Sequence, residues 1–326
     1  MAATHRFPLW RIPDWFPERI GARFPQFRVV HLASYENVHL EIADAEIYFG
    51  FLLPPANFAL AQQLRWIHVS AAGVDQILYP EMVASPVIVT NSSSVMAEPV
   101  AEYIIALMLA LAKRLPSAMR YQRESQWAQT DVALEEPTMQ ELQDATLGIV
   151  GLGAIGTRLV ELARAFGMRV IAVKQNVHRP EGLRHKVDRV WPPSALREML
   201  AEADYVVLAA PQTSSTARMM GAAEFAAMKP TAYFINVARG ALVDEAALCE
   251  ALETRRIAGA AADVFDPEPL PPESPLWKAP NMLVTPHLAA TTGQLWRRHA
   301  ELFEDNLSRY LDGRPLRNLI DKKAGY

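Results

Sequence analysis

Cysteine is almost missing from this sequence of 326 residues, in which Cys249 stands alone. A single cysteine excludes an internal disulfide and any metal site built from several cysteines. It lies in "DEAALCEAL", a helical pattern in which we expect a buried, unreactive thiol. The first residues lack the apolar core of a signal peptide, and the longest apolar run, "YIIALMLALA", is shorter than the ~20 residues of a membrane span. We therefore expect a cytoplasmic protein without a membrane partner.

A basic excess is also missing. The net charge is −4 and the pI about 6.1, so the balance does not call for nucleic acid as a partner. Hydrophobic residues make up 51% and charged residues 21%, which is typical of a globular protein and not of a disordered one. The length exceeds what one core normally serves and predicts two domains.

Short apolar runs alternate with helical patterns along most of the chain. Early runs that read as buried strands are "FRVVHLA", "AEIYFGFLL", "LRWIHVS" and "PVIVTNS". Six later runs are "TLGIVGLG", "MRVIAV", "ADYVVLAA", "AYFINVA", "GAAADVF" and "NMLVTPHL", separated by helical stretches that include 154–166, 194–202 and 244–252. This alternation predicts an α/β protein with parallel sheets covered by helices on both faces.

Two doubly wound domains follow from this order. A single long helix is expected over 97–127, and the later six strands are enough for a Rossmann nucleotide-binding sheet. The amphipathic tail, a helix ending near Gly313, is short for a domain of its own. We expect it to return to the first domain, so that 1–98 plus 289–326 form a discontinuous substrate domain and 99–288 the dinucleotide-binding domain.

A glycine-rich turn follows the first strand of the later set. Gly151, Gly153 and Gly156 form G-x-G-x-x-G between a predicted strand and a predicted helix. The first glycine permits a tight turn, the second lets a pyrophosphate approach and the third lets the helix pack on the strand. Amides near Ala154 and Ile155 would face the phosphates. The alternative is a packing turn without a ligand.

Three polar residues close or follow predicted strands of the same domain. Arg239 closes "FINVARG", Glu268 follows "ADVFDPEP" and His287 closes "LVTPH". Ligands of doubly wound sheets lie beyond the carboxyl ends of the strands. Arginine grips a carboxylate, histidine exchanges a proton near neutral pH, and a carboxylate beside the histidine favours its charged form. The set is suited to hydride transfer between an alcohol and a ketone. Taken singly, each could be an ordinary surface residue.

With these residues in view, the sequence resembles the D-isomer-specific 2-hydroxyacid dehydrogenase family over nearly its whole length. The resemblance rests on "GIVGLGAIGTRLVELARAFGMRVIAV", "MKPTAYFINVARGALVDEAALCEAL", "AGAAADVFDPEPLPPESPLWKAPNMLVTPHLAATT" and "LDGRPLRN". It implies a flavodoxin-like substrate domain beside the Rossmann domain. It also implies that Arg239 binds the substrate, that His287 is the general acid/base and that Glu268 is its partner.

Further roles are implied by the same resemblance. The loop "HVSAAGVD" would hold the substrate carboxylate through Ala72 and Gly73, and the cofactor would be contacted by Pro211, Thr216, Val237, Ala238, Asp263 and Ala289. Ala289 and Ala290 stand where glycine or serine is common in the family. Formate-oxidising relatives have glutamine where this chain has Glu268, which argues against formate. A homodimer formed through the nucleotide-binding domain is implied, with its contact on the long helix after Ala97.

The exit of the second strand of the later set bears on the choice of cofactor. Relatives that prefer NAD carry an aspartate where this chain has Lys174. The exit offers no carboxylate and presents Lys174, Gln175, Asn176, His178 and Arg179. A cation is what a 2′-phosphate requires, so NADP is expected, with Lys174, Gln175 and Arg179 as contacts. The alternative is a solvated surface with NAD bound through Gln175 and Asn176.

The expected activity is hydride transfer between NAD(P)H and a small 2-keto or 2-hydroxy acid of the D series, without a metal. Glyoxylate and hydroxypyruvate are the first candidates. Two alternatives stay open at this point. One is a dinucleotide-sensing protein resembling a transcriptional corepressor, and the other is a phosphoglycerate or phosphite dehydrogenase on the same scaffold.

Overall fold

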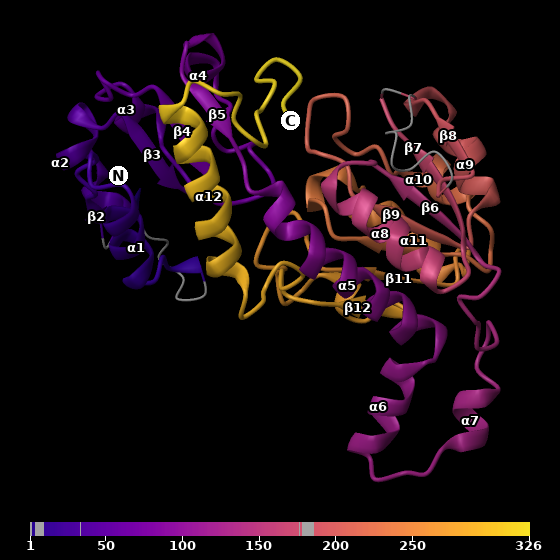
Figure 1. Cartoon of the computed structure of the whole chain (residues 1–326). Coiled ribbons are helices and arrows are strands. Elements are labelled where there is room, and N and C mark those ends of the chain that lie inside the picture. The colour runs from indigo at the N-terminus through magenta and orange to yellow at the C-terminus, as the bar shows by residue number, and fades with distance from the viewer. Residues whose placement is uncertain (1, 4–9, 33, 176, 178–185) are drawn as a thin grey trace. The chain divides into compact units, whose positions relative to one another are not determined.

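The computed structural model describes residues 2–3, 10–32, 34–175, 177 and 186–326, and Figure 1 traces the chain. Two compact units are formed. The terminal unit consists of Met1–Met96 and Thr291–Tyr326, and the central unit consists of Ala97–Ala290. Each unit is an α/β body with one parallel sheet.

The terminal unit contains a five-stranded sheet in the order β2-β1-β3-β4-β5. Every pairing is parallel, and the order is that of flavodoxin-like folds, as predicted. Its strands are β1 (Ala2–Ala3), β2 (His31–Leu32), β3 (Ile47–Gly50), β4 (Trp66–Val69) and β5 (Ile88–Thr90). Strand β1 is not among the predicted strands, and β2 is shorter than predicted, because a two-residue strand has no periodicity in the sequence.

The central unit contains a seven-stranded parallel sheet in the order β12-β11-β10-β9-β6-β7-β8. Its strands are β6 (Thr146–Val150), β7 (Arg169–Val173), β8 (Arg189–Trp191), β9 (Tyr205–Leu208), β10 (Tyr233–Asn236), β11 (Gly259–Ala262) and β12 (Met282–Val284). The predicted Rossmann arrangement is confirmed, but the expected six strands are seven. The missed strand, β8, is a three-residue edge strand that begins with an exposed arginine, so it leaves no continuous apolar run.

Helices flank both sheets. In the terminal unit they are α1 (Trp15–Arg23), α2 (Val38–Glu41), α3 (Pro55–Phe58), α4 (Pro80–Ala84) and α12 (Leu295–Leu311). Helix α5 (Ser93–Ala112) begins in the terminal unit and continues into the central unit. The central unit also has α6 (Leu115–Arg123), α7 (Gln129–Ala133), α8 (Ala154–Ala165), α9 (Leu196–Glu202), α10 (Ala222–Ala227) and α11 (Glu245–Glu253).

The single helix expected over 97–127 is wrong. Helix α5 ends at Ala112, Arg114 adopts a left-handed conformation with φ of 54°, and α6 restarts at Leu115. Pro116 explains the break, because proline has no N–H to continue the ladder and its ring clashes with the preceding turn. Arg114 is buried, and its guanidinium donates hydrogen bonds to the carbonyl oxygen of Pro137 and to Asn281.

Helix α5 is long and apolar enough to cross a membrane by length and composition alone. Within the structure, however, 61% of its most apolar window is buried. The core helix of a globular unit can have the same length and composition as a membrane span. The burial of α5 is that of a core helix.

Two buried histidines anchor the core of the terminal unit. His68 of β4 contacts Thr90 through Nδ1 at 2.8 Å and Ser92 through Nε2 at 3.0 Å, and the Ser92 hydroxyl also lies 3.1 Å from Nδ1 of His299 on α12. Burial lowers the pKa of both His68 and His299 to about 3, so both rings stay neutral near pH 7. This network ties α12, from the end of the chain, to the sheet formed by its beginning.

Candidate active site

The loops that carry the predicted site residues of the central unit all begin after one row of strand-end residues. The last residues of all seven strands are register partners: Trp191, Val173, Val150, Leu208, Asn236, Ala262 and Val284. Because the strands are parallel, the chain leaves each of them at the same edge of the sheet. The glycine turn, Lys174, Arg239, Glu268 and His287 all follow this row, which is the edge where doubly wound sheets bind ligands.

His287 and Glu268 meet directly, from the loops after β12 and β11. Nδ1 of His287 lies 2.8 Å from Oε2 of Glu268, while Oε1 of Glu268 accepts a hydrogen bond from the amide of Phe265 at 3.0 Å. Their side chains are partly exposed, 46% for His287 and 37% for Glu268. Since Nδ1 faces the carboxylate, Nε2 is the ring atom that can exchange a proton with a ligand.

The charge of Glu268 is set by competing effects. Burial raises its pKa, but the hydrogen bond and charge of His287, the Phe265 amide and the charge of Arg239 together hold the pKa of Glu268 below its ordinary value. A carboxyl group with a lowered pKa stays ionised to a more acidic pH than usual. Glu268 therefore places a negative charge beside the imidazole of His287.

Asp263 shapes the loop that carries His287. It is 1% exposed, and its Oδ1 accepts hydrogen bonds from the Thr285 hydroxyl at 2.6 Å and the Leu288 amide at 2.9 Å. Its Oδ2 accepts one from the amide of Ala289 at 2.8 Å. His287 sits between these anchors with φ of 55°, a left-handed conformation that side chains rarely adopt. The structure thus gives Asp263 and Ala289 a structural task at the place where the sequence predicts cofactor contacts.

The turn that carries Arg239 is pressed against the loop that carries Glu268. A Cβ atom on Gly240 would overlap with the carbonyl group of Phe265, so only glycine permits this contact. Glu245, at the start of α11, accepts a hydrogen bond from the amide of Asp266 at 2.9 Å. Neither Gly240 nor Glu245 is among the residues predicted from the sequence. The signal for Gly240 was available, since a glycine after a strand-end arginine marks a close backbone approach.

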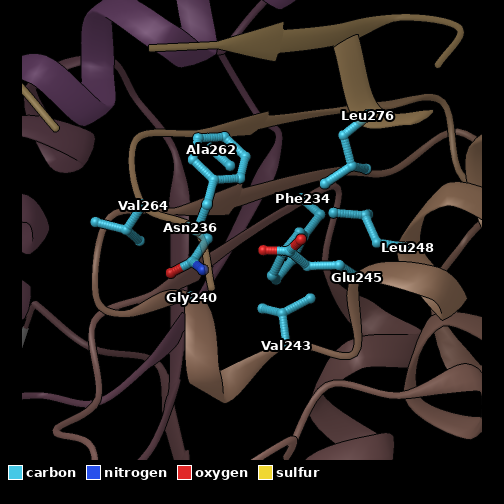
Figure 2. A pocket seen from close by; sticks show the side chains of 10 residues that line it. Phe234, Asn236, Gly240, Val243, Glu245, Leu248, Ala262, Val264 and Leu276 are labelled. Carbon is cyan, nitrogen blue, oxygen red and sulfur yellow. The ribbon is translucent and has the colours of Figure 1, made fainter. Parts of the chain in front are cut away.

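Figure 2 shows the small cavity at this contact, with Asn236, Gly240 and Glu245 around it. Its volume is about 10 Å³, enough for roughly one water molecule. A dinucleotide or a keto acid does not fit there. The cavity lies where the turn that carries Arg239 packs against the loop that carries Glu268.

The three glycines of the turn differ in what surrounds them. Gly151 has φ of 103°, and a Cβ atom on it would lie 2.6 Å from the carbonyl oxygen of Ala209. A Cβ atom on Gly156 would lie 2.5 Å from the carbonyl oxygen of Gly151, so the helix and the turn are in close contact. Beside Gly153 there is nothing within 4 Å. Gly153 precedes Ala154 and Ile155, the first residues of α8, so this open space fits a pyrophosphate approaching the helix start.

Other predicted residues lie in loops of the two units. In the central unit the Thr216 hydroxyl donates to the carbonyl oxygen of Pro211 at 2.7 Å, which closes the loop after β9. Val237 is buried and Ala238 half-buried, directly before Arg239. In the terminal unit Ala72 and Gly73 follow β4, and Asn91 Nδ2 donates to the carbonyl oxygen of Ala72 at 2.6 Å.

The predicted 2′-phosphate contacts are only partly described. Lys174 directly follows β7, and its amide donates to the carbonyl oxygen of Trp191 at 3.0 Å. Pairing with β8 therefore fixes its backbone, and Gln175 next to it is exposed. Asn176, His178 and Arg179 lie outside the described residues.

Comparison with known proteins identifies a family and a relative with a similar sequence. The family description "D-isomer specific 2-hydroxyacid dehydrogenase, NAD binding domain" matches residues 105–289. A glyoxylate reductase from Korarchaeum cryptofilum is 34% identical over 288 residues, 87% of this chain and 85% of the relative.

Two solved structures are similar over nearly the whole chain. A D-isomer-specific 2-hydroxyacid dehydrogenase from Xanthobacter autotrophicus, in complex with NADPH, is 29% identical with a TM-score of 0.84 and full coverage of both chains. An NADPH-dependent glyoxylate/hydroxypyruvate reductase from Sinorhizobium meliloti, in complex with NADP, is 26% identical with a TM-score of 0.83, covering 100% of this chain and 99% of the other.

The unequal surroundings of the glycines predict unequal effects of alanine. Gly153→Ala meets no protein atom, so we expect an unfolding temperature within ~2 °C of the wild type but a dinucleotide affinity at least ~10-fold weaker, because the new methyl group occupies the phosphate approach. Gly156→Ala must push the helix from the turn and should cost about 1–3 kcal/mol of stability. Thermal unfolding and fluorescence titration with NADPH separate the two effects. Unchanged NADPH affinity in Gly153→Ala would contradict this assignment.

Proposed function

The chain belongs to the D-isomer-specific 2-hydroxyacid dehydrogenase family, and from this premise we propose that it reduces a small 2-keto acid to the D-2-hydroxy acid with NADPH. The observation that carries the proposal is the His287–Glu268 pair, 2.8 Å apart at the sheet edge that also carries Arg239 and the glycine turn. The glyoxylate reductase relative and the NADPH-dependent glyoxylate/hydroxypyruvate reductase support the substrate class. The central unit is the dinucleotide-binding domain and the terminal unit the substrate domain in this proposal.

The side chains divide the work of the reaction between them. When bound, the nicotinamide supplies the hydride for the carbonyl carbon. Arg239 holds the substrate through its carboxylate and carbonyl oxygens, with a planar guanidinium suited to two parallel hydrogen bonds. Nε2 of His287 gives a proton to the carbonyl oxygen as the alcohol forms, and takes it back in the reverse direction. Glu268 keeps the ring oriented through its contact with Nδ1 and places a negative charge beside it.

Substrate recognition extends to the terminal unit in our proposal, with the amides of Ala72 and Gly73 as further ligands of a carboxylate. Glyoxylate and hydroxypyruvate are the candidates to assay first. The acid/base pair argues against formate, which has no hydroxyl proton to move. Glyoxylate reductases among the relatives favour this activity over a corepressor-like or a phosphoglycerate-oxidising role. We place the enzyme in the cytoplasm, where a single buried thiol and no disulfide are usual.

Removal of the proton donor tests the mechanism. His287→Asn should lower kcat for glyoxylate reduction at least ~100-fold, because the imidazole that protonates the carbonyl oxygen is gone, while the Kd of NADPH stays within ~2-fold. Steady-state kinetics and fluorescence titration measure the two quantities. Turnover like that of the wild type would rule out His287 as the general acid.

Glu268→Gln tests the contribution of the negative charge beside His287. The amide oxygen can still accept a hydrogen bond from Nδ1, but the negative charge beside the ring is gone. We expect kcat for glyoxylate reduction to fall ~10-fold or more, while the Kd of NADPH stays within ~2-fold. A kcat equal to that of the wild type would show that the charge of Glu268 has no part in the reaction.

NADP is the proposed cofactor, with NAD as a possible substitute. Lys174 lies directly after β7, where NAD-preferring relatives carry an acid, and two similar structures were solved with NADPH or NADP. A cation at this position attracts the 2′-phosphate, whereas a carboxylate would repel it. Gln175 and Arg179 are proposed as additional contacts.

Reversal of this charge gives a direct test. Lys174→Asp should shift the ratio of kcat/KM for NADPH over NADH by at least ~10-fold toward NADH, since one favourable charge contact becomes a repulsion. Lys229→Asp is a control of equal charge change elsewhere in the central unit, where the lysine pairs with Asp204 at 2.7 Å. An unchanged ratio in Lys174→Asp, or a wild type that prefers NADH, would contradict the choice of NADP.

A homodimer is proposed to form through the segment 115–139, called here the arm. In Figure 1 the arm, with α6 and α7, projects away from the seven-stranded sheet. It exposes five large apolar side chains: Leu115 at 48%, Met119 at 53%, Trp127 at 93%, Leu134 at 73% and Met139 at 45%. So many exposed large apolar side chains on one segment favour an interaction surface, and a second copy of the chain is the partner that the family resemblance implies. The contact predicted on the helix expected over 97–127 is thus placed on the arm, which contains α6, and not on the largely buried α5.

The oligomeric state tests the arm. We expect light scattering to give a mass of twice 36.3 kDa for the wild type, and a monomer for the double variant Trp127→Glu with Leu134→Glu. Leu40→Glu changes another exposed apolar residue, in the terminal unit, and should leave the dimer intact. A monomeric wild type would refute the dimer, and a dimeric double variant would refute its location.

A further inference from the structure

We infer that Asn236, a residue without an assigned role, is the positioning residue that holds Arg239 in its substrate-binding place. The inference rests on the proposed function, because it concerns the residue that we expect to bind the carboxylate of the keto acid. Asn236 is the last residue of β10 and 1% exposed. Figure 2 shows it near Gly240, and both residues line the small cavity.

The side chain of Asn236 binds the backbone just before and at Arg239. Its Oδ1 accepts a hydrogen bond from the amide of Ala238 at 3.0 Å, and its Nδ2 donates one to the carbonyl oxygen of Arg239 at 3.0 Å. The guanidinium in turn donates from Nη1 to the carbonyl oxygen of Ala238 at 2.8 Å. Thus the direction of the arginine side chain depends on a short loop that Asn236 closes.

The backbone of Asn236 connects the same turn to the acid/base loop. Its carbonyl oxygen accepts a hydrogen bond from the amide of Asp263 at 2.9 Å. The carbonyl oxygen of Asp263 accepts the amide of His287 at 2.9 Å, and the Asp263 side chain holds the residues on either side of His287. Asn236 therefore connects, through hydrogen bonds, to both the turn of Arg239 and the loop of His287.

The chemistry of this position calls for an amide. The turn needs one acceptor and one donor at the end of the same short side chain, and asparagine supplies both. Aspartate has the same shape but would set a second acceptor against the carbonyl oxygen of Arg239. Val264, Phe265 and Gly240 surround the cavity, so backbone groups released here gain little hydration from a space of about 10 Å³.

Asn236→Asp and Asn236→Ala test the inference with two independent readouts. We expect the KM for glyoxylate and the Kd of oxalate, a dicarboxylate probe that needs no turnover, to rise at least ~10-fold in both variants. The Kd of NADPH should stay within ~2-fold, since the glycine turn is untouched. Arg239→Met, which removes the guanidinium, shows how far the KM for glyoxylate and the Kd of oxalate rise when the carboxylate contact is lost completely.

Asn306 offers a matched control in the terminal unit. It is fully buried and clamps Arg317 in the same way, donating to its carbonyl oxygen at 3.1 Å and accepting its amide at 2.7 Å. Asn306→Ala should lower the unfolding temperature and leave the KM for glyoxylate and the Kd of oxalate within ~2-fold. An equal loss of oxalate binding in this control would show a general effect of destabilisation and would overturn the inference.

The outcomes separate this inference from the proposed function. If the wild type binds oxalate but reduces no 2-keto acid, the proposed function fails, and weaker oxalate binding in Asn236→Asp still supports the inference. If the wild type is an active reductase and both Asn236 variants keep its KM and oxalate affinity, the inference fails alone. Asn236→Asp retains the shape of the native side chain and serves if Asn236→Ala does not fold.

Discussion

The shared end of seven parallel strands is the constraint on which the candidate site depends. Trp191, Val173, Val150, Leu208, Asn236, Ala262 and Val284 are register partners in one row, and each is the last residue of its strand. Side chains separated by more than a hundred residues of sequence therefore enter the same edge of one sheet. A shift of β12 by one residue would turn the loop of His287 away from Glu268, because alternate strand residues face opposite sides.

Backbone hydrogen bonds extend this order beyond the strands themselves. The amides of Asp263, Thr285 and His287 bind the carbonyl oxygens of Asn236, Ala262 and Asp263, so the ladder continues into the loops that carry Glu268 and His287. The buried carboxylate of Asp263 then holds His287 in a left-handed conformation that is unfavourable by itself. Such a rigid support leaves little rearrangement to be made when a substrate binds, which is what electrostatic preorganisation requires.

The glycines along the same edge of the sheet differ in how much room there is for a side chain. Gly151, Gly156 and Gly240 are glycines because protein atoms lie where a side chain would be, whereas Gly153 faces open space. The first three glycines permit close packing of the protein backbone, and Gly153 leaves room for a ligand. Lys174 lies at the same edge, where pairing of its amide with Trp191 fixes the backbone that carries this lysine at the exit of β7.

The sequence by itself determined the α/β class, the two kinds of sheet, the glycine turn and the identity of Arg239, Glu268 and His287, because apolar runs and strand-end polar residues are local patterns. It failed where the signal was too short or local rules competed: β1 and β8 have two and three residues, and Pro116 breaks the long helix predicted to run past it. Only the tertiary structure decided the 2.8 Å contact between His287 and Glu268, the burial of Asp263 and the clamp of Asn236 on Arg239. These depend on strand register and on backbones that approach each other from distant parts of the chain, which no local pattern of residues encodes.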